Sequence, residues 1–369
     1  MSRSDRPAAL PPGTTIGILG GGQLGRMTVV AASQLGYRCH IFCQSPDEPA
    51  AQIAPQTTIA AFTDTGALDS FAANIDVATL EFENIPLSSV EYVEARAPVR
   101  PSSRALAVAQ DRIKEKDFIT AAGIATAPYR AVASRAELTD AVADLGTPAV
   151  LKTVRLGYDG KGQIRIDRDT DLDQAWAQSG TDASIGGAIL EGFVDFEREI
   201  SVIAARGIDG AMTSYVPVEN RHANHILDTT IVPAPISGEL AATATDIARR
   251  LAEKLDLVGL LAVEMFVSQD QGILVNEIAP RPHNSGHWTI DACAVSQFEM
   301  LVRAVCGLPL GSTERDADAT MRNLIGSDVE DWQSYLTDPT AHLHLYGKSD
   351  VRPGRKMGHV TWLTPRALP

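Results

Sequence analysis

The sequence predicts a multi-domain protein of mixed α/β and α+β class. The first third alternates short β-branched runs with helical patterns, which is typical of a parallel sheet with crossover helices. The middle region has apolar runs in close succession, which favours antiparallel strands. At 369 residues, the chain is long enough to form two or three packed domains.

The N-terminal third is predicted to form one domain behind a short tail. Residues 1–12 are polar and proline-rich and are expected to be disordered. The runs TTIGIL, YRCHIF, TTIAAF and DVATLEF are predicted strands, and a helix is expected to begin near Gln23. Because two prolines break the pattern in PVRPSS around residues 98–103, we place the N-terminal domain at residues 13–103.

Residues 104–308 are predicted to form a second domain. A helical stretch covers about residues 104–122, and PAVLKTV, QIRI, AILEGFV, REISVIAA and AMTSYVPV are predicted strands. An amphipathic helix over about 239–255 leads into two strand-like runs, GLLAVEMFV and GILVNEIAP. Within this domain, about residues 125–195 are expected to form a lid subdomain. The remaining residues, 309–369, carry strand signals in HLHLY and GHVTWL and are predicted to form a small β-rich domain.

Composition and charge exclude several classes of protein. Hydrophobic residues make up 44% of the chain, yet no apolar run approaches the ~20 residues of a membrane span, so no membrane partner is expected. The formal net charge of −14 disfavours nucleic-acid binding, which needs a basic face. The N-terminus lacks a signal-peptide pattern, and the four cysteines are too scattered for a disulfide framework. We therefore expect a cytoplasmic protein with reduced, mostly buried thiols.

A glycine-rich turn follows the first predicted strand. In GILGGGQLGR, Gly20, Gly22 and Gly25 fit the pattern G-x-G-x-x-G between a strand and a helix, where backbone amides favour an anion. A dinucleotide site would need an acidic residue at the end of the second strand, but none occurs before Asp47. A dinucleotide turn, a turn that contacts another phosphate and a purely structural turn all stay open on this motif alone.

A second glycine-rich segment, GYDGKGQ at residues 157–163, follows the predicted strand that carries Lys152. So many glycines are entropically costly in a hairpin and suit a flexible lid that closes over phosphates. An ordinary hairpin is the alternative. The segment is not a Walker loop, because no serine or threonine follows Lys161.

Two glutamates occupy neighbouring predicted strands. Glu264 in VEMFV and Glu277 in VNEIAPR would lie on one face of adjacent antiparallel strands, close enough to share a hard cation at oxygen ligands. Their apolar flanks disfavour plain solvent exposure, and buried carboxylates are costly without a cation. The pair is therefore a candidate metal site, with two ordinary surface glutamates as the alternative.

Two further segments are candidates for binding an anionic substrate. The run APRPHNSGHWT contains too much proline and glycine for a helix, so zinc binding by its two histidines is disfavoured, and a structural loop is the alternative to substrate contact. Its polar side chains are those of Arg281, His283, Asn284, Ser285 and His287. Near the C-terminus, Asp350 alone opposes a basic cluster of Lys348, Arg352, Arg355 and Lys356.

Taken in order, these motifs resemble the ATP-grasp superfamily across essentially the whole chain. Within it, GGGQLGRM, LEFENIP, DRIKEK, GYDGKGQ, NEIAPRPHNSGHWT and VRPGRKMGH are similar to the 5-(carboxyamino)imidazole ribonucleotide synthetase family. The resemblance implies an ATP-grasp fold: an N-terminal Rossmann-like (preATP-grasp) parallel-sheet domain, a central ATP-grasp domain and a small C-terminal β-rich domain. It also implies a ligase of purine biosynthesis that uses ATP and bicarbonate to carboxylate 5-aminoimidazole ribonucleotide through carboxyphosphate.

The resemblance implies roles for individual residues. Those expected to bind ATP are Arg112, Lys152, Gly157, Tyr158, Asp159, Gly160, Lys161, Gly162, Gln163, Glu191, Gly192, Phe193, Val194, Glu199, His222, Asn276 and Glu277. Those expected to bind the ribonucleotide are Gln23, Leu24, Tyr158, Asp159, Arg281, His283, Asn284, Lys348 and Arg355. Arg281, Lys348 and Asp159 would act in catalysis, and Glu264 and Glu277 would bind Mg²⁺, with two ions expected. Relatives of this kind imply a homodimer.

One position departs from the superfamily pattern, and three rival functions are less compatible with the motifs. Many ATP-grasp relatives carry an asparagine metal ligand where this chain has Ala279, which leaves the number of ions open. Formate-dependent glycinamide ribonucleotide transformylases share the architecture but have a serine-rich lid and usually Asp after the histidine. An NAD oxidoreductase is favoured only by the first glycine motif. The Lys152, Glu264 and Glu277 side chains argue against a non-catalytic nucleotide-binding protein.

Overall fold

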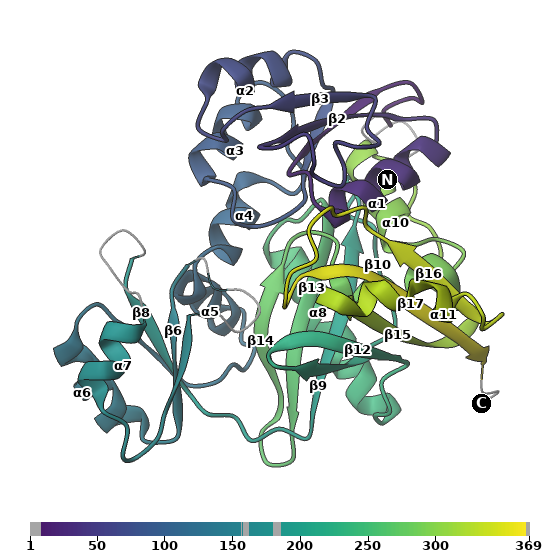
Figure 1. The fold of residues 1–369 in the computed structure, drawn as a ribbon. Helices are drawn as coiled ribbons and strands as arrows, with labels where there is room; N and C mark the ends of the chain where they lie inside the picture. The colour runs from purple at the N-terminus through teal and green to yellow at the C-terminus, as the bar shows by residue number, and fades with distance from the viewer. Residues whose placement is uncertain (1–8, 156, 158–161, 180–185, 367–369) are drawn as a thin grey trace.

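The computed structural model describes residues 9–155, 157, 162–179 and 186–366, and within these residues the strands form three sheets (Figure 1). Most of the expected N-terminal tail, residues 1–8, lies outside the described part of the chain. None of the helices in the described part is long and apolar enough to cross a membrane.

The N-terminal sheet is parallel, with the strand order β3-β2-β1-β4. Its central strands are almost fully buried, as expected for a parallel sheet with helices on its faces. The alternation of strands and crossover helices predicted for this region is confirmed. The elements are β1 (Thr15–Leu19), α1 (Gln23–Gln34), β2 (Arg38–Cys43), β3 (Gln56–Ile59), α2 (Thr65–Ala72), β4 (Val77–Leu80) and α3 (Leu87–Glu94).

The predicted helical stretch at 104–122 is two helices rather than one. Helix α4 (Ser103–Ala109) ends before Gln110, and α5 (Arg112–Ala121) begins after Asp111. The Asp111 carboxylate accepts hydrogen bonds from two backbone N–H groups in the first turn of α5. This N-cap is why the chain restarts a helix at that point.

The central sheet has nine strands, and eight of them run in the order β14-β13-β9-β11-β12-β15-β17-β16, with β10 paired to β9. Helices α4, α5 and α8 (Gly238–Lys254) pack their apolar side chains against one face of β9, β13 and β14. The antiparallel character predicted for this region is confirmed. Its strands before the C-terminal segment are β9 (Arg198–Arg206), β10 (Met212–Ser214), β11 (Val218–Ala223), β12 (Ile226–Val232), β13 (Gly259–Ser268) and β14 (Gly272–Ala279).

The C-terminal strands extend this central sheet instead of forming a sheet of their own. Strand β15 (Ala317–Ile325) pairs with β12, and β17 (Lys356–Pro365) lies between β15 and β16 (Ala341–Leu345). Figure 1 shows these strands in yellow, beyond β12. Short helical segments connect them and the preceding loop: η1 (Asn284–Gly286), α9 (Thr289–Ala292), η2 (Gly326–Asp331) and α11 (Trp332–Tyr335).

A third, antiparallel sheet stands apart from the other two, at the lower left of Figure 1, and has the order β5-β8-β6-β7. Two helices pack on it, and their apolar residues form a separate small core with the strands. Its elements are β5 (Tyr129–Val132), α6 (Arg135–Leu145), β6 (Ala149–Thr153), β7 (Gln163–Ile166), α7 (Leu172–Gln178) and β8 (Ala188–Gly192). These strands carry the lysine and the glutamate expected near ATP.

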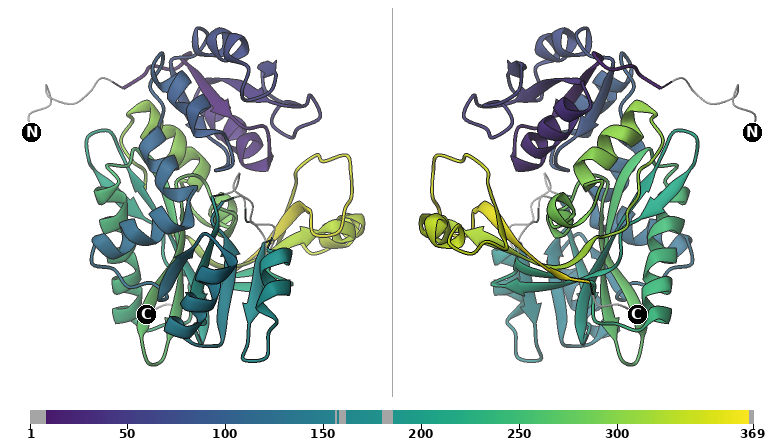
Figure 2. Two further views of the ribbon diagram at one scale, coloured as in Figure 1. Left: turned by 90° about the vertical axis from the view of Figure 1, so that its left-hand side faces the viewer. Right: turned by 90° about the vertical axis from the view of Figure 1, so that its right-hand side faces the viewer.

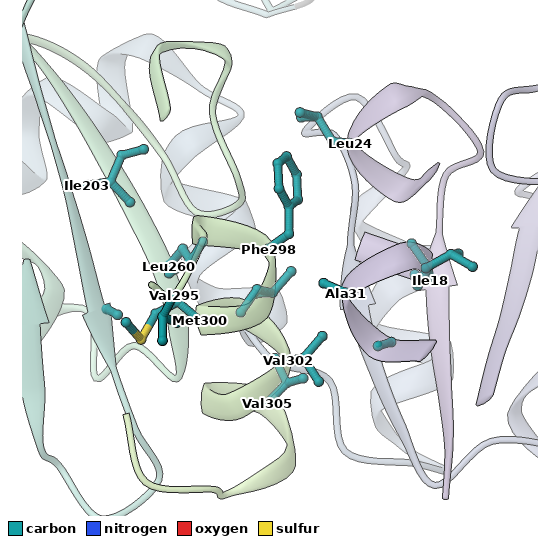
Figure 3. Packing of buried hydrophobic residues seen from close by; sticks show 14 of the residues in the cluster. Ile18, Leu24, Ala31, Ile203, Leu260, Val295, Phe298, Met300, Val302 and Val305 are labelled. Atoms are coloured by element: carbon teal, nitrogen blue, oxygen red, sulfur yellow. The ribbon is translucent and has the colours of Figure 1, made fainter. Parts of the chain in front are cut away.

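The largest hydrophobic core joins the N-terminal sheet to the central sheet. Helix α10 (Gln297–Cys306) lies between α1 and strands β9 and β13, and its Phe298 approaches Leu24 of α1 (Figure 3). Side views of the molecule show the N-terminal domain seated over this helix (Figure 2). Three of the four cysteines are buried and all four are free thiols, as expected.

Candidate active site

The N-terminal glycine turn is built around a buried carboxyl group of the protein itself. Leu24 donates its backbone N–H to Glu81 Oε1 at 3.3 Å, so this carboxyl group occupies the N-terminus of α1. A Cβ added to Gly22 would lie 2.3 Å from the same oxygen, and one added to Gly20 would lie 2.7 Å from Glu81 Oε2. Of the three readings of this motif, the structure favours the structural turn. Gln23, the expected substrate contact, is the first residue of α1.

The lid sheet carries a buried ion cluster. Glu191 Oε2 lies 3.0 Å from Lys152 Nζ and 3.5 Å from Lys116 Nζ of α5. Burial alone would raise the pKa of Glu191, but Lys152 and Lys116 outweigh it and lower that pKa to about 2. The Nζ of Lys116 has no hydrogen-bond partner among the described residues. The cluster thus places two cations next to each other and balances them with one carboxylate.

A second ion pair connects α5 to the central sheet. Arg112 Nη1 lies 3.0 Å from Glu277 Oε2, and Glu115 accepts the backbone N–H of Ile278 at 2.7 Å. Burial and the neighbouring Glu277 raise the pKa of Glu115 to about 8. Desolvation would also raise the pKa of Glu277, but Arg112 and Lys152 outweigh it and hold that pKa below its ordinary value. Glu277 is therefore the ionised member of this group.

The two glutamates expected to hold a metal face each other directly. Glu264 on β13 and Glu277 on β14 are register partners, and a β-bulge leaves Asn276 as the extra residue between the pairs. Burial and Glu277 together raise the pKa of Glu264 to about 8. Asn276 Oδ1 is buried without a hydrogen-bond partner among the described residues. Three oxygen donors are thus gathered at one point of the sheet.

Next to this pair lies a group of residues expected to contact nucleotide and substrate. His222 forms an ion pair with Glu199 across β11 and β9, and both line a small cavity with Glu264 and Asn276. Desolvation lowers the pKa of His222, but the contact with Glu199 outweighs it and leaves that pKa raised. His283 Nε2 lies 3.5 Å from Glu264 Oε1 on the other side.

The loop after β14 faces the N-terminal domain. Arg281 Nη2 lies 2.6 Å from Glu83 Oε1, so a cation of the central domain pairs with an acid of the LEFENIP segment. Arg281 Nε and both polar side-chain atoms of Asn284 are buried and have no hydrogen-bond partner within the described residues. Such groups ordinarily find partners, so a polar ligand bound at this loop would satisfy them.

The basic C-terminal segment makes hydrogen bonds within its own loop. Lys348 Nζ donates to the backbone oxygen of Lys356 at 2.6 Å, and Arg355 donates to that of Asp350 at 2.8 Å. The neighbouring Gly347 oxygen accepts a hydrogen bond from Gln52 of the N-terminal domain at 2.8 Å. This hydrogen bond therefore connects the loop to the N-terminal domain.

A histidine stack lies behind this site. Ligand atoms of Asp291, His344 and His359 come within 4.8 Å of one another, which is close enough to consider a metal. However, the His344 and His359 rings stack with centroids 4.5 Å apart and an angle of 15°, so their in-plane lone pairs do not converge on one point. His344 Nε2 instead lies 3.0 Å from both Asp291 oxygens. We interpret this group as a hydrogen-bonded stack that connects α9 to β16 and β17.

Several of the expected site residues contact one another, and others lie elsewhere. Leu24 packs its side chain into the large core, and Phe193 stacks under Arg165, whose Cζ is 4.7 Å from the ring centroid. Gly192 and Phe193 donate their backbone N–H groups to other backbone oxygens, and Val194 is buried. Gly157, Gly162 and Gln163 are the described ends of the glycine-rich segment. Its centre, Tyr158, Asp159, Gly160 and Lys161, lies outside the described residues.

Sequence reasoning assigned no role to several residues that contact the expected site residues. Lys116 follows Arg112 by four residues, a spacing that places both side chains on one face of α5, and this signal was available in DRIKEK. Glu115 and Glu83 also lie inside quoted motifs. Ser201 and Asn220 had no such signal, because a lone serine or asparagine within a strand is common.

Three family models together cover most of the chain. The ATP-grasp domain model matches residues 117–298, the ribonucleotide synthetase preATP-grasp domain model matches residues 13–110, and the phosphoribosylaminoimidazole carboxylase C-terminal domain model matches residues 319–367. All three belong to the architecture that the motifs implied.

Curated relatives and solved structures agree with these matches. An N5-carboxyaminoimidazole ribonucleotide synthase of Brucella melitensis is 49% identical over 98% of this chain and 99% of that protein. A bifunctional purine synthesis protein purC/E of Dictyostelium discoideum is 46% identical over 96% of this chain, which spans only 38% of that longer protein.

Among solved structures, an ADP complex of purK, an N5-carboxyaminoimidazole ribonucleotide synthetase, is similar with a TM-score of 0.93 and 42% identity, covering 99% of this chain and 94% of that one. An Aspergillus clavatus N5-carboxyaminoimidazole synthase in complex with ADP and 5-aminoimidazole ribonucleotide has a TM-score of 0.89 and 32% identity, covering 96% and 94%. With relatives of this identity matched over almost its whole length, the chain belongs to the N5-carboxyaminoimidazole ribonucleotide synthase family of the ATP-grasp superfamily.

Proposed function

We propose that this protein catalyses the ATP-dependent carboxylation of 5-aminoimidazole ribonucleotide with bicarbonate, which gives N5-carboxyaminoimidazole ribonucleotide, ADP and phosphate in purine biosynthesis. The observation that carries the proposal is the Glu264 and Glu277 pair, in which Glu277 contacts Arg112 of α5 and Glu264 lies near His283 of the loop after β14. Membership of the family supports the same reaction.

The ATP half of the cleft is assigned to the residues near the lid sheet. Arg112 and Lys152 provide positive charge for the phosphates, and Glu191 holds Lys152 in place at 3.0 Å. In the proposal, Glu191 and the main chain at Phe193 and Val194 lie at the adenine end. Glu199 and His222 lie at the ribose end. The roles of Gly157 to Gln163 as a lid stay a proposal, because most of that segment lies outside the described residues.

The donor set fits Mg²⁺. Two carboxylates directly opposite each other on neighbouring strands are destabilising without a cation. Asn276 lies next to Glu277, and its Oδ1 has no hydrogen-bond partner in the described part of the chain. Glu264 and Glu277, assisted by Asn276, would hold the ion. The ion would neutralise charge on the ATP phosphates during phosphoryl transfer.

The ribonucleotide half is assigned to the loop after β14 and to the C-terminal segment. Arg281, His283 and Asn284 would bind the ribonucleotide, and the Asn284 amide supports this because it is buried and has no hydrogen-bond partner within the described residues. Lys348 and Arg355 would bind the phosphate, with Gln23, Leu24, Tyr158 and Asp159 near the same pocket.

The reaction follows from this arrangement. A bicarbonate oxygen attacks the γ-phosphorus of ATP in line, the bond to the ADP oxygen breaks, and carboxyphosphate forms. The exocyclic amine of the ribonucleotide then bonds to the carboxyl carbon, directly or after release of carbon dioxide, while phosphate leaves and the amine loses a proton. Arg112 and Lys152 stabilise the transferring phosphoryl group. Closure of the lid would exclude water, which otherwise hydrolyses carboxyphosphate.

The remaining assignments belong to the same proposal. The domains are proposed at residues 13–103, 104–308 and 309–369, with the lid at about 125–195. The protein is proposed to be a cytoplasmic homodimer that acts on small molecules and binds neither nucleic acid nor membranes.

A coupled phosphate-release assay tests the function. ATP turnover is expected to require 5-aminoimidazole ribonucleotide, and bicarbonate is expected to be needed for the carboxylated product. Stimulation by glycinamide ribonucleotide with formate, or turnover that ignores both ribonucleotides, would refute the proposal. Removal of Mg²⁺ by a chelator is expected to stop turnover, and its return should restore it.

A further inference from the structure

A chain of buried hydrogen bonds leads from the middle of the central sheet to His283. Thr230 donates its hydroxyl to Asn220 Oδ1 at 3.2 Å, and Asn220 Nδ2 donates to Ser201 Oγ at 2.9 Å. Ser201 donates in turn to Ser285 Oγ at 2.8 Å, and Ser285 Oγ lies 2.8 Å from His283 Nδ1. The four residues behind His283 are all buried.

The direction of this chain is fixed at its histidine end. The backbone N–H of Ser285 points at His283 Nδ1 at 3.3 Å, and a backbone N–H can only donate. Nδ1 must therefore present its lone pair, and a neutral imidazole with a bare Nδ1 carries its hydrogen on Nε2. Because the Ser285 hydroxyl also faces this lone pair, it must donate to it.

The directions of the next two hydrogen bonds, between Ser285 and Ser201 and between Ser201 and Asn220, follow from the same reasoning. Each serine hydroxyl has a single hydrogen, so Ser285 must accept from Ser201, and Ser201 must accept from a group that only donates. The Asn220 amide NH₂ is such a group, and the Thr230 hydroxyl holds the amide in this orientation from its other side. In each hydrogen bond of the chain, the donor is then the group farther from His283.

We propose that Asn220, Ser201 and Ser285 are positioning residues that hold His283 in the tautomer with hydrogen on Nε2. That N–H is on the nitrogen that lies 3.5 Å from Glu264 Oε1. The consequence for catalysis rests on the proposed function: His283 serves as a fixed hydrogen-bond donor to the oxygen atoms of the reacting carboxyl or phosphoryl group. It does not take the proton from the ribonucleotide amine, because the nitrogen that faces the cleft already carries one.

A purely structural role for the chain would predict different results. The links tie β9, β11 and β12 to the loop after β14, so removal of one link is expected to lower stability under either reading. Only the positioning role predicts that the tautomer of His283 changes as well. The tautomer is therefore the measurement that separates the two roles.

The test is nitrogen NMR of the full-length protein with ¹⁵N-labelled histidine. Long-range ¹H–¹⁵N correlation spectra distinguish a bare ring nitrogen from a protonated one, and loss of one spin system in His283→Gln assigns the resonances. In the wild type, Nδ1 of His283 is expected to be the bare nitrogen and Nε2 the protonated one. A protonated Nδ1 in the wild-type protein would overturn the proposal.

Two variants and two controls test the chain itself. Ser285→Ala and Ser201→Ala remove the hydroxyl donors but keep the backbone N–H of residue 285 that points at Nδ1. Both His283 resonances are therefore expected to shift part of the way toward values averaged over the two tautomers, with kcat reduced by about tenfold to a hundredfold. Ser201→Thr, which keeps the hydroxyl, is expected to restore the wild-type spectrum. Ser89→Ala removes a buried serine hydroxyl in α3 and is expected to leave the His283 resonances unchanged.

Unchanged His283 resonances in both alanine variants would overturn the positioning role. Altered resonances with wild-type kcat would overturn the catalytic consequence. The spectra of the free protein do not depend on the reaction, so failure of the proposed activity would be seen separately, in the phosphate-release assay.

Discussion

Gly22→Ala is expected to destabilise the N-terminal domain through a contact with Glu81. The backbone at Gly22 has φ −75° and ψ −165°, a conformation that alanine adopts without strain. The added Cβ, however, would lie 2.3 Å from Glu81 Oε1, and this carboxyl group is buried at the N-terminus of α1. The glycine is therefore required by its neighbour rather than by its own dihedral angles.

The expected loss of stability combines three contributions. Displacing a packed group typically costs about 1–3 kcal/mol, and losing the hydrogen bond from Leu24 to Glu81 adds about 0.5–1.5 kcal/mol. Replacing a glycine by alanine also restricts the unfolded chain, which restores about 0.4–1 kcal/mol. The net loss in the free energy of unfolding is therefore about 0.5–4 kcal/mol.

Urea unfolding followed by circular dichroism measures this loss. Gly66→Ala is the matched control, because the nearest atom to its added Cβ is 3.5 Å away, and this variant should be as stable as the wild type or slightly more stable. In a Glu81→Ala background, Gly22→Ala should cost little, since the clashing oxygens are gone. Equal losses with and without Glu81, or a Gly22→Ala variant as stable as the control, would refute the reasoning.

Two further predictions concern the cleft. Glu277→Gln is expected to lower kcat by about 10²–10³-fold, because it removes a charge from the proposed metal site, and to leave the circular dichroism spectrum unchanged. Glu330→Gln, at an exposed position, is the control. Near-normal turnover of Glu277→Gln would contradict the assignment. Burial alone would raise the folded-state pKa of Glu191, but the neighbouring Lys152 and Lys116 outweigh it and lower this pKa from 4.5 to about 2. The contribution of Glu191 to stability is therefore present above pH 4.5 and is lost as the pH falls toward 2. Urea unfolding should therefore show the advantage of wild type over Glu191→Gln shrinking between pH 6 and pH 3, and a constant difference would count against this explanation.

Local patterns predicted the elements of the fold well. The runs RCHIFC and GLLAVEMFV are strands β2 and β13, and the amphipathic pattern at 239–255 is helix α8, which Ser237 caps. The pairing of β15 with β12 could not be predicted in this way, because about 90 residues of chain separate the partners and no local signal specifies which edge a strand joins. The break between α4 and α5 was overlooked, although Asp111 is a common N-cap residue.

Residue types predicted the metal pair but not the geometry that completes it. Strand alternation places Glu264 and Glu277 on one face, and they are indeed register partners. The bulge that adds Asn276 to this face depends on how the two strands pair, which alternation alone does not reveal. Glu81 was missed for a different reason: the glycine motif suggested an external anion, whereas the protein supplies the carboxyl group itself.

The hydrophobic core around α10 determines which parts of this protein can be treated as modules. Its apolar residues come from β1, α1 and β2 as well as from β9, β13 and β15, so the N-terminal domain and the central sheet share one interior. Neither part could be exchanged between homologues or expressed alone without leaving half of that interior exposed to water. The β5 to β8 sheet has its own core, so gene fusion or loop grafting would best be attempted there.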